Sequence, residues 1–187
     1  MSKEEARKHI TALVKNMSAT EKLEASEAVS ERLRSLASIK FADIIFSYFP
    51  LENEVCLLSL MRDWIDESVT VAVPLTNWEN KTIRAGLVTS LDANELVETR
   101  HNIKEPIHRH PIPTDSVDII LVPGVGFNAN GTRLGKGGGF YDRFLEHHRP
   151  PIVLGIAFDE QIVDTIPSEE HDQKMTAVIT PTRTMLC

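Results

Sequence analysis

Five of the protein's nine glycines lie within one short stretch, Asn130 to Arg143, which reads NGTRLGKGGGFYDR. Arg133, Lys136 and Arg143 are interleaved with these glycines. Glycine lets backbone N–H groups approach a ligand closely, and consecutive N–H groups form a concave anion site to which cations add charge. An apolar segment precedes the stretch and an amphipathic segment follows it. This pattern predicts a strand, a loop that holds a polyphosphate or another anion, and a helix whose N-terminus points at the same anion. We favour it over a flexible glycine linker.

The common nucleotide-binding signatures do not account for this stretch. A P-loop requires four residues between its first glycine and Gly-Lys, followed by Ser or Thr. Here three residues separate Gly131 from Gly135, and Gly137 follows Lys136. The segment 124–129, GVGFNA, matches the dinucleotide pattern G-x-G-x-x-A. That fingerprint must open a helix, whereas the following Asn-Gly pair is a turn signal. We therefore predict no nicotinamide site.

Helical and strand patterns alternate along the rest of the chain. Apolar spacing predicts a helix over 3–17, and Ser18 with Glu21 predicts a capping box that opens a second helix with Leu23 on its apolar side. A third helical pattern covers 57–65. Short apolar or β-branched runs predict strands at 43–49, 70–73, 83–88, 96–99, 119–122, 152–156 and 177–180.

The alternation of strands with helices favours a mainly parallel sheet that is covered on both faces. The predicted fold class is therefore α/β, with residues 1–187 forming a single three-layer domain. Prolines at 106, 111 and 113 predict an irregular crossing loop in the middle of the chain.

Composition and charge exclude several classes of protein. The chain has 187 residues, of which 42% are hydrophobic and 25% charged, as in ordinary globular proteins. No run approaches the ~20 apolar residues of a membrane span, and the first residues lack the apolar core of a signal peptide. We therefore expect a cytoplasmic protein without a membrane partner. The net charge of −7 argues against nonspecific binding of nucleic acid.

The chain resembles one protein family over nearly the whole of its 187 residues. The segment 123–145, PGVGFNANGTRLGKGGGFYDRFL, is similar to the signature of the 5-formyltetrahydrofolate cyclo-ligases, also called 5,10-methenyltetrahydrofolate synthetases. The opening 3–7, the run SYFPLENEV at 47–55 and HDQK at 171–174 fall in the family's order and approximate spacing. The resemblance implies a Rossmann-like fold and an ATP- and Mg²⁺-dependent conversion of 5-formyltetrahydrofolate to 5,10-methenyltetrahydrofolate, with release of ADP and phosphate.

In the implied reaction, the formyl oxygen attacks the γ-phosphate of ATP, and a neighbouring folate nitrogen then closes the ring as phosphate leaves. Phosphoryl transfer requires positioning and charge neutralisation more than a covalent residue. The sequence agrees, since it has no G-x-S-x-G elbow and no local Cys/His signature of a covalent enzyme. We expect the enzyme to act as a monomer, with an oligomer as the alternative.

The resemblance assigns phosphate chemistry to the first helix and the glycine-rich loop. Arg133 and Lys136 match its phosphate-binding positions and are the candidate catalytic residues. The implied ATP contacts are Lys3, Arg7, Arg133, Leu134, Gly135, Lys136, Gly137, Gly138, Gly139, Phe140 and Tyr141. From the residues alone, Lys3 and Arg7 can equally be exposed residues near a chain start, and Arg133 a solvated turn residue.

The resemblance also assigns the folate and magnesium positions. Phe49 and Glu54 match folate-contacting positions of the family. Their chemistry is suitable, since a carboxylate can accept the paired N–H donors of a pterin and an aromatic ring can pack on its face. Asp142 and Asp172 match the magnesium carboxylates. From the residues alone, Phe49 can be a core residue, Glu54 an acid in a helix's first turn, and Asp142 a helix cap.

Two other classes of function remain open. A sugar-phosphate or coenzyme A-handling enzyme on a similar α/β fold would use the glycine loop for a substrate phosphate, and would need neither ATP nor the Lys3 and Arg7 pair. A non-catalytic folate- or nucleotide-binding protein would bind its ligands without turnover. The near-ultraviolet absorption of methenyl-folate, which the formyl substrate lacks, separates all three.

Overall fold

A seven-stranded sheet forms the centre of the computed structural model, which describes residues 2–169 and 172–187. Its strands are β1 (Ile44–Phe46), β2 (Thr70–Asn77), β3 (Thr82–Val88), β6 (Ile119–Pro123), β9 (Ile152–Ile156), β10 (Ala177–Ile179) and β11 (Thr184–Leu186). The order across the sheet is β11-β10-β9-β6-β1-β2-β3. The strands from β10 to β2 are parallel to one another, and the edge strands β3 and β11 are antiparallel to their neighbours. The predicted mainly parallel α/β fold is confirmed.

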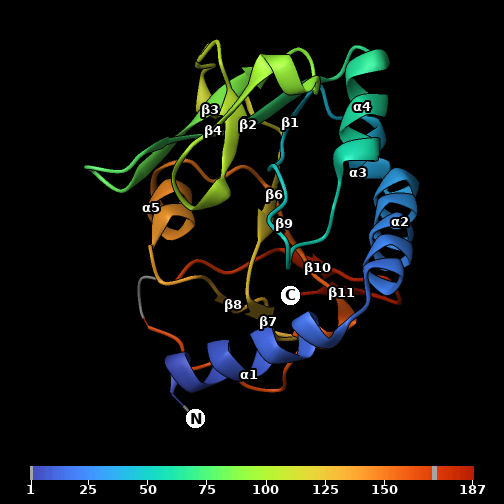
Figure 1. The fold of residues 1–187 in the computed structure, drawn as a ribbon, viewed down its shortest axis with the longest axis vertical. Coiled ribbons are helices and arrows are strands. Elements are labelled where there is room, and N and C mark those ends of the chain that lie inside the picture. Colours follow the sequence, from blue (N-terminus) through green and yellow to red (C-terminus); the bar gives the residue numbers. More distant parts are fainter. Residues whose placement is uncertain (1, 170–171) are drawn as a thin grey trace.

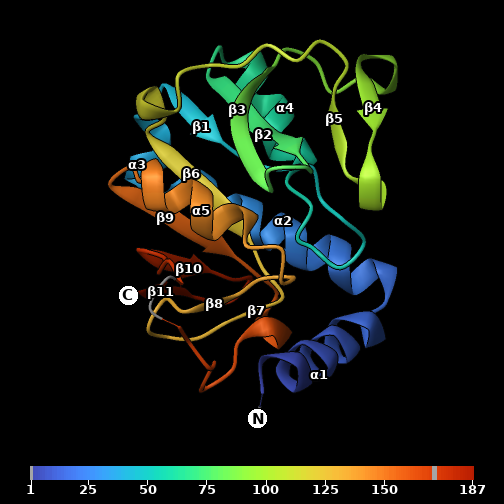
Figure 2. The same ribbon diagram turned by 90° about the vertical axis from the view of Figure 1, so that its left-hand side faces the viewer.

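Helices cover both faces of the sheet and one of its ends. The helices are α1 (Lys3–Asn16), α2 (Ala19–Ser35), α3 (Ala37–Lys40), α4 (Leu58–Asp66) and α5 (Phe140–His147). Figure 1 shows the sheet between α2 and α4 on one side and α5 on the other. In Figure 2, turned by 90°, α5 lies in front of the sheet and α2 behind it. Helix α1 lies apart from both layers, at the end of the molecule that carries the N-terminus.

Two small ribbons and four 3-10 turns complete the fold. The ribbons pair β4 (Leu96–Glu98) with β5 (Lys104–Pro106), and β7 (Gly126–Phe127) with β8 (Arg133–Leu134). The 3-10 turns are η1 (Ala93–Glu95), η2 (Arg100–Asn102), η3 (Thr114–Ser116) and η4 (Asp159–Gln161). In the described part of the chain, no helix is both long and apolar enough to cross a membrane.

Local capping explains where the first two helices begin. The Ser18 side chain accepts a hydrogen bond from the Glu21 N–H group, while the Glu21 carboxylate accepts one from the Ser18 N–H group. The predicted capping box is therefore confirmed, and Ser2 with Glu5 forms a second one at α1. The prediction for Leu23 is wrong. It is 68% exposed, because the buried stripe of α2 runs through Val29 and Leu33 instead.

Strand lengths differ from the predictions where tertiary pairing decides them. The strand predicted over 43–49 ends at Phe46, because beyond the Ser47 N–H group, which still bonds Ala72, the chain leaves the sheet. Strand β2 runs four residues further than predicted, because its far half pairs with β3. The expected irregular loop follows a short strand, β5, that ends at Pro106 and pairs with β4. Proline is tolerated at such an edge position.

Helix α1 joins the rest of the molecule through a small separate core. Ala6 and Ile10 of α1 pack with Leu134 and Ile166. A Cβ atom on Gly126 would lie 2.5 Å from Cδ1 of Ile10, so the glycine permits this close approach. Residues 126–127 form a strand and not the start of a helix. The prediction that the G-x-G-x-x-A match is not a dinucleotide site is therefore supported by the geometry.

The connections reverse direction between two central strands. From β1 the chain continues to β2 and β3 on one side, whereas β6, β9 and β10 lie on the other side. In open α/β sheets, ligands bind outside the carboxyl ends of the strands at such a switch point. The segments that follow β1 and β6 contain the SYFPLENEV run and the glycine-rich stretch. The topology therefore brings the two most informative parts of the sequence together.

Candidate active site

Two adjoining cavities lie at the switch point. The first, here called the aromatic cavity, is lined by rings from three segments, namely Tyr48, Phe49, Trp78, Phe140 and Tyr141. The second, here called the N-terminal cavity, is lined by Arg7, Thr11 and Val14 of α1 and by residues from the segments around 52, 102, 125 and 161. Their volumes are about 160 and 440 Å³. The aromatic cavity is smaller than the ~300–1,000 Å³ of most pockets that bury a whole ligand, so it suits one end of an elongated ligand.

Glu54 presents a buried carboxylate to the aromatic cavity. Its side chain is 8% exposed, and its Oε1 atom lies 2.7 Å from the Nζ atom of Lys136. The Oε2 atom accepts a hydrogen bond from the Leu51 N–H group at 3.0 Å. Helix α4 begins only at Leu58, so the alternative that placed Glu54 in a helix's first turn is wrong. Phe49 is 7% exposed and combines core packing with a place in the cavity wall.

Two phenols lie close to this carboxylate, namely the buried Tyr48 and the partly buried Tyr141. Burial, and then the negative charge of Glu54, raise the pKa of Tyr141 far above its usual value. The same two causes raise the pKa of Tyr48, whose hydroxyl donates to the Val55 carbonyl at 2.9 Å. Both side chains are therefore neutral at physiological pH, and the cavity offers aromatic surface around the Glu54 carboxylate, with Asp142 as a second carboxylate in its lining.

The glycine-rich loop turns sharply into helix α5. Gly137 and Gly139 have φ angles of 98° and 66°, in the left-handed region that glycine adopts without steric cost. Gly139 is the N-cap of α5. Asp142 is therefore the third helical residue and does not cap the helix, so that alternative is wrong. Its charge still lies in the first turn, where the helix dipole favours an anion.

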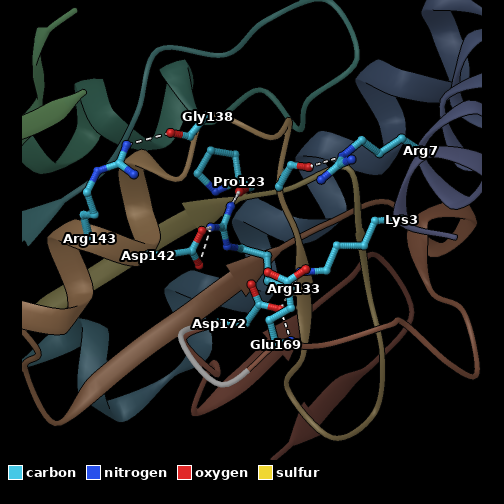
Figure 3. Close-up of polar contacts among 10 residues, drawn as sticks. Lys3, Arg7, Pro123, Arg133, Gly138, Asp142, Arg143, Glu169 and Asp172 are labelled. Carbon is cyan, nitrogen blue, oxygen red and sulfur yellow. Dashed lines mark hydrogen bonds and ion pairs between the residues drawn. The ribbon is translucent and has the colours of Figure 1, made fainter. Parts of the chain in front are cut away.

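Asp142 instead holds the guanidinium group of Arg133. The Nη2 atom of Arg133 lies 3.0 Å from both carboxylate oxygens of Asp142, and its Nη1 atom donates to the Pro123 carbonyl at 3.4 Å (Figure 3). Arg133 is not the solvated turn residue of the alternative prediction, since its side chain is only 5% exposed. A Cβ atom on Gly135 would lie 2.8 Å from this Nη1 atom, so Gly135 makes room for the arginine.

The first helix brings its two predicted cations to different places (Figure 3). Arg7 lines the N-terminal cavity, and its Nε–H group donates to the Gly135 carbonyl at 2.8 Å. Lys3 lies 2.7 Å from Asp172 and 3.4 Å from Glu169. Burial lowers the pKa of Lys3, but the hydrogen bond and charge of Asp172 outweigh burial and raise it overall. Neither Lys3 nor Asp172 is among the described residues that line the two cavities.

One of the two predicted magnesium carboxylates faces a cavity. Asp142 lines the aromatic cavity and is 18% exposed. A carboxylate has about four lone-pair sites, so its bonds to Arg133 leave room for a cation. Over residues 2–169 and 172–187, no three His, Cys, Asp or Glu side chains are grouped to hold a metal ion. Asp142 alone could serve an ion that brings phosphate ligands with it, since Mg²⁺ commonly takes only one or two carboxylates. His171 of the HDQK segment lies outside the described residues.

Several lining residues were not among the predicted site residues. Trp78 extends the aromatic wall, with its ring 5.2 Å from Phe140 and 5.2 Å from His101 between centroids. An isolated tryptophan in a polar turn was a weak signal for it. Gln161 is buried and donates to the carbonyl groups of Gly124 and Val125, which fixes the chain just after β6. No sequence pattern marks a role of this kind.

The family model that describes the 5-formyltetrahydrofolate cyclo-ligase family matches residues 1–181. The chain belongs to this family. A 5-formyltetrahydrofolate cyclo-ligase from Mycolicibacterium smegmatis is 31% identical over 92% of each chain, and the mouse enzyme of the same name is 27% identical over 87% of this chain and 85% of the relative. The solved structure of Aquifex aeolicus 5,10-methenyltetrahydrofolate synthetase superimposes with a TM-score of 0.86 at 29% identity, over 100% of this chain and 93% of that one. Membership of this family confirms the resemblance found in the sequence. It also identifies the chain as a ligase of folate metabolism.

Proposed function

We propose that this cyclo-ligase family member converts 5-formyltetrahydrofolate to 5,10-methenyltetrahydrofolate, using ATP and releasing ADP and phosphate. The observation that carries the proposal is the junction of two cavities of different chemistry. One has aromatic walls, a buried carboxylate and the glycines of the loop in its lining, and the other has the guanidinium group of Arg7, which donates to that loop. The two cavities share a boundary that is lined by Leu51, Glu54, Gly124 and Lys136. Ligands that occupy the two cavities would therefore meet at this boundary.

The aromatic cavity has the chemistry to hold the folate ring system. A pterin presents paired N–H donors on its aminopyrimidine edge, and the Glu54 carboxylate can accept them. The flat faces of the ring can pack on Phe49 and Tyr141, since aromatic pairs gain energy beyond the area that they bury. The small volume of the cavity leaves the benzoyl-glutamate tail outside, toward the rim where Lys104 lines the opening.

The N-terminal cavity and the glycine-rich loop have the chemistry to hold ATP. Arg7 and Lys136 supply charge, and Gly137 has the left-handed backbone that directs N–H groups toward an anion in other anion-binding loops. Arg133 has a different proposed role from the direct phosphate contact implied by the resemblance. Because Asp142 and Pro123 hold its guanidinium group, it would fix the loop and the start of α5 relative to β6.

Asp142 is the residue that would hold magnesium, together with phosphate oxygens and water. When bound there, the ion would offset the negative charge on the phosphates. Asp172 remains a second predicted ligand, although the structure pairs it with Lys3. The monomeric state also remains a prediction.

The protein's own residues account for three requirements of the reaction. Glu54 and the aromatic rings orient the folate so that its formyl oxygen faces the boundary between the cavities. Lys136, at that boundary, offsets charge on the transferred phosphoryl group, which suits a reaction governed by positioning and electrostatics. The apolar walls formed by Tyr48 and Phe49 exclude water from the activated intermediate, which water would otherwise hydrolyse.

The test is a spectroscopic assay of the purified protein with 5-formyltetrahydrofolate, MgCl₂ and ATP. We expect the near-ultraviolet band of the methenyl product to appear only with all three, together with stoichiometric ADP. Binding of both ligands without the band would indicate a non-catalytic protein. An enzyme of sugar phosphates or coenzyme A would bind its phosphate ligand and leave the folate spectrum unchanged.

A further inference from the structure

The ion pair between Glu54 and Lys136 separates the two cavities. Both residues line the aromatic cavity and the N-terminal cavity, and their charged atoms lie 2.7 Å apart. The pair therefore belongs to both sites at once. A ligand that draws Lys136 toward the N-terminal cavity must separate it from Glu54, and a ligand that bonds Glu54 competes with Lys136.

The two partners differ in how much they depend on each other. The Glu54 side chain is 8% exposed, whereas the Lys136 side chain is 54% exposed. A buried carboxylate without a partner is costly, because burial removes its hydration. If Lys136 moves away, Glu54 retains the hydrogen bond from the Leu51 N–H group, but it has no other ion-pair partner among the described residues. Lys136 itself would lose little, since water already reaches it.

A ligand in the aromatic cavity can replace what Lys136 supplies. A heterocycle with two adjacent N–H donors would satisfy the Glu54 oxygen that now faces the ammonium group. Lys136 would then be free to bind an anion in the N-terminal cavity. In the reverse order, an anion that holds Lys136 would leave Glu54 open to the heterocycle.

We propose that the Glu54–Lys136 ion pair couples the two cavities, so that an N–H donor heterocycle at Glu54 and a polyphosphate at Lys136 each strengthen the binding of the other. The identity of the two ligands, a reduced folate and ATP, rests on the proposed function. Coupling between two sites is reciprocal, so each ligand must change the affinity of the other by the same factor. A coupling of roughly 5-fold or more is expected for one such contact.

Calorimetric titration with a non-hydrolysable β,γ-imido analogue of ATP and MgCl₂ tests this coupling without turnover. In the wild-type protein, saturating 5-formyltetrahydrofolate should lower the dissociation constant of the analogue roughly 5-fold. In Glu54→Gln, the analogue should bind that much more tightly even without folate, because the lysine is no longer held. In Lys136→Gln, folate should bind more tightly than in the wild type, because the carboxylate is no longer occupied.

Glu52→Gln is the matched control. Glu52 is an exposed acid that also lines the N-terminal cavity, so its removal changes the local charge without touching the ion pair. The ratio of the analogue's dissociation constants with and without folate should stay at the wild-type value. A gain of affinity in Glu54→Gln that Glu52→Gln reproduces would mean a general charge effect and would overturn the proposal.

Gains of affinity distinguish coupling from a structural role, because a variant that damages the site weakens both ligands. The proposal fails if the analogue binds equally well with and without folate to the wild-type protein. It also fails if Glu54→Gln binds the analogue no more tightly than the wild type. A protein that forms the methenyl product but shows neither effect retains the proposed function and lacks the coupling. A protein that gains analogue affinity in Glu54→Gln but forms no product retains the ion-pair competition and lacks the proposed function.

Discussion

The Nζ atom of Lys136 lies 2.7 Å from the Oε1 atom of Glu54, so two residues assigned to different substrates form one ion pair. Lys136 comes from the loop that leads from β8 to α5, and Glu54 from the segment between β1 and α4. Since β1 and β6 are neighbours in the sheet, these segments meet above their carboxyl ends. The pair gives the separate roles of both residues consequences that kinetics can test.

Replacement of Lys136 by alanine should impair the use of ATP. The variant loses a charge that serves the phosphates, and we expect a loss of ~2–4 kcal/mol in transition-state stabilisation, as for single electrostatic donors in other enzymes. Steady-state kinetics should show a raised KM for ATP with no increase in the folate KM. Lys8→Ala, which removes an exposed lysine from α1, is the control. Wild-type kinetics for Lys136→Ala at subsaturating ATP would exclude its phosphate role.

Replacement of Glu54 by glutamine should impair the use of folate. Glutamine keeps the shape but loses the charge that favours two hydrogen bonds from the pterin edge. We expect a raised folate KM, while the KM for ATP measured at saturating folate stays nearly unchanged. Equal increases in both would indicate a structural residue instead.

Asp142→Asn should show whether Asp142 is a magnesium ligand or only the ion-pair partner of Arg133. The variant leaves the buried guanidinium group without its anion, which should lower the free energy of unfolding by about 1–3 kcal/mol. As a magnesium ligand, the residue should also require much more MgCl₂ for half-maximal methenyl formation. The double variant Arg133→Gln/Asp142→Asn removes both charges and should recover part of the lost stability. It should still require more MgCl₂ than the wild type for half-maximal methenyl formation. A magnesium curve that matches the wild type in Asp142→Asn excludes the metal role.

Both tyrosines of the protein should resist ionisation in the folded state. Burial and the Glu54 charge raise the pKa of Tyr48 and Tyr141, whereas an unfolded tyrosine titrates near pH ~10. The folded state therefore keeps its phenolic protons where the unfolded state releases them. Their contribution to stability is complete below pH ~10 and is lost as the pH rises further. Tyrosinate absorbance should appear together with the loss of circular dichroism, and Tyr48→Phe should halve its amplitude. A gradual titration near pH ~10 in the folded protein would contradict the raised pKa of the two phenols.

Sequence patterns predicted the features that depend on near neighbours. The capping box at Ser18 and the helices over 3–17 and 57–65 arise from hydrogen bonds and apolar spacing within a few residues, and the structure confirms them with shifts of one or two residues at their ends. The positions of the main strands along the chain were predicted for the same reason, but their order in the sheet was not. Strands β5, β7, β8 and β11 were missed, because strands of two or three residues exist only through their pairing.

The site was predicted in part. The glycine-rich loop and its helix were identified because positive φ angles and cation spacing are written locally in the chain. The alternatives for Arg133 and Asp142 treated each residue by itself, and both were wrong, since the two hold each other. No local pattern indicates that an arginine is buried against an aspartate nine residues later.

The sequence by itself determined the fold class, the sharp glycine-rich loop before helix α5 and family membership, because these depend on periodicity, backbone freedom and motif spacing. Only the tertiary structure decided that Arg7 fastens the loop at Gly135 and that Lys136 lies against Glu54. These contacts join segments that are remote in the chain, and they form because the sheet places β6 beside β1. Which cations remain available to a ligand is therefore a property of strand order, which no local stretch of residues encodes.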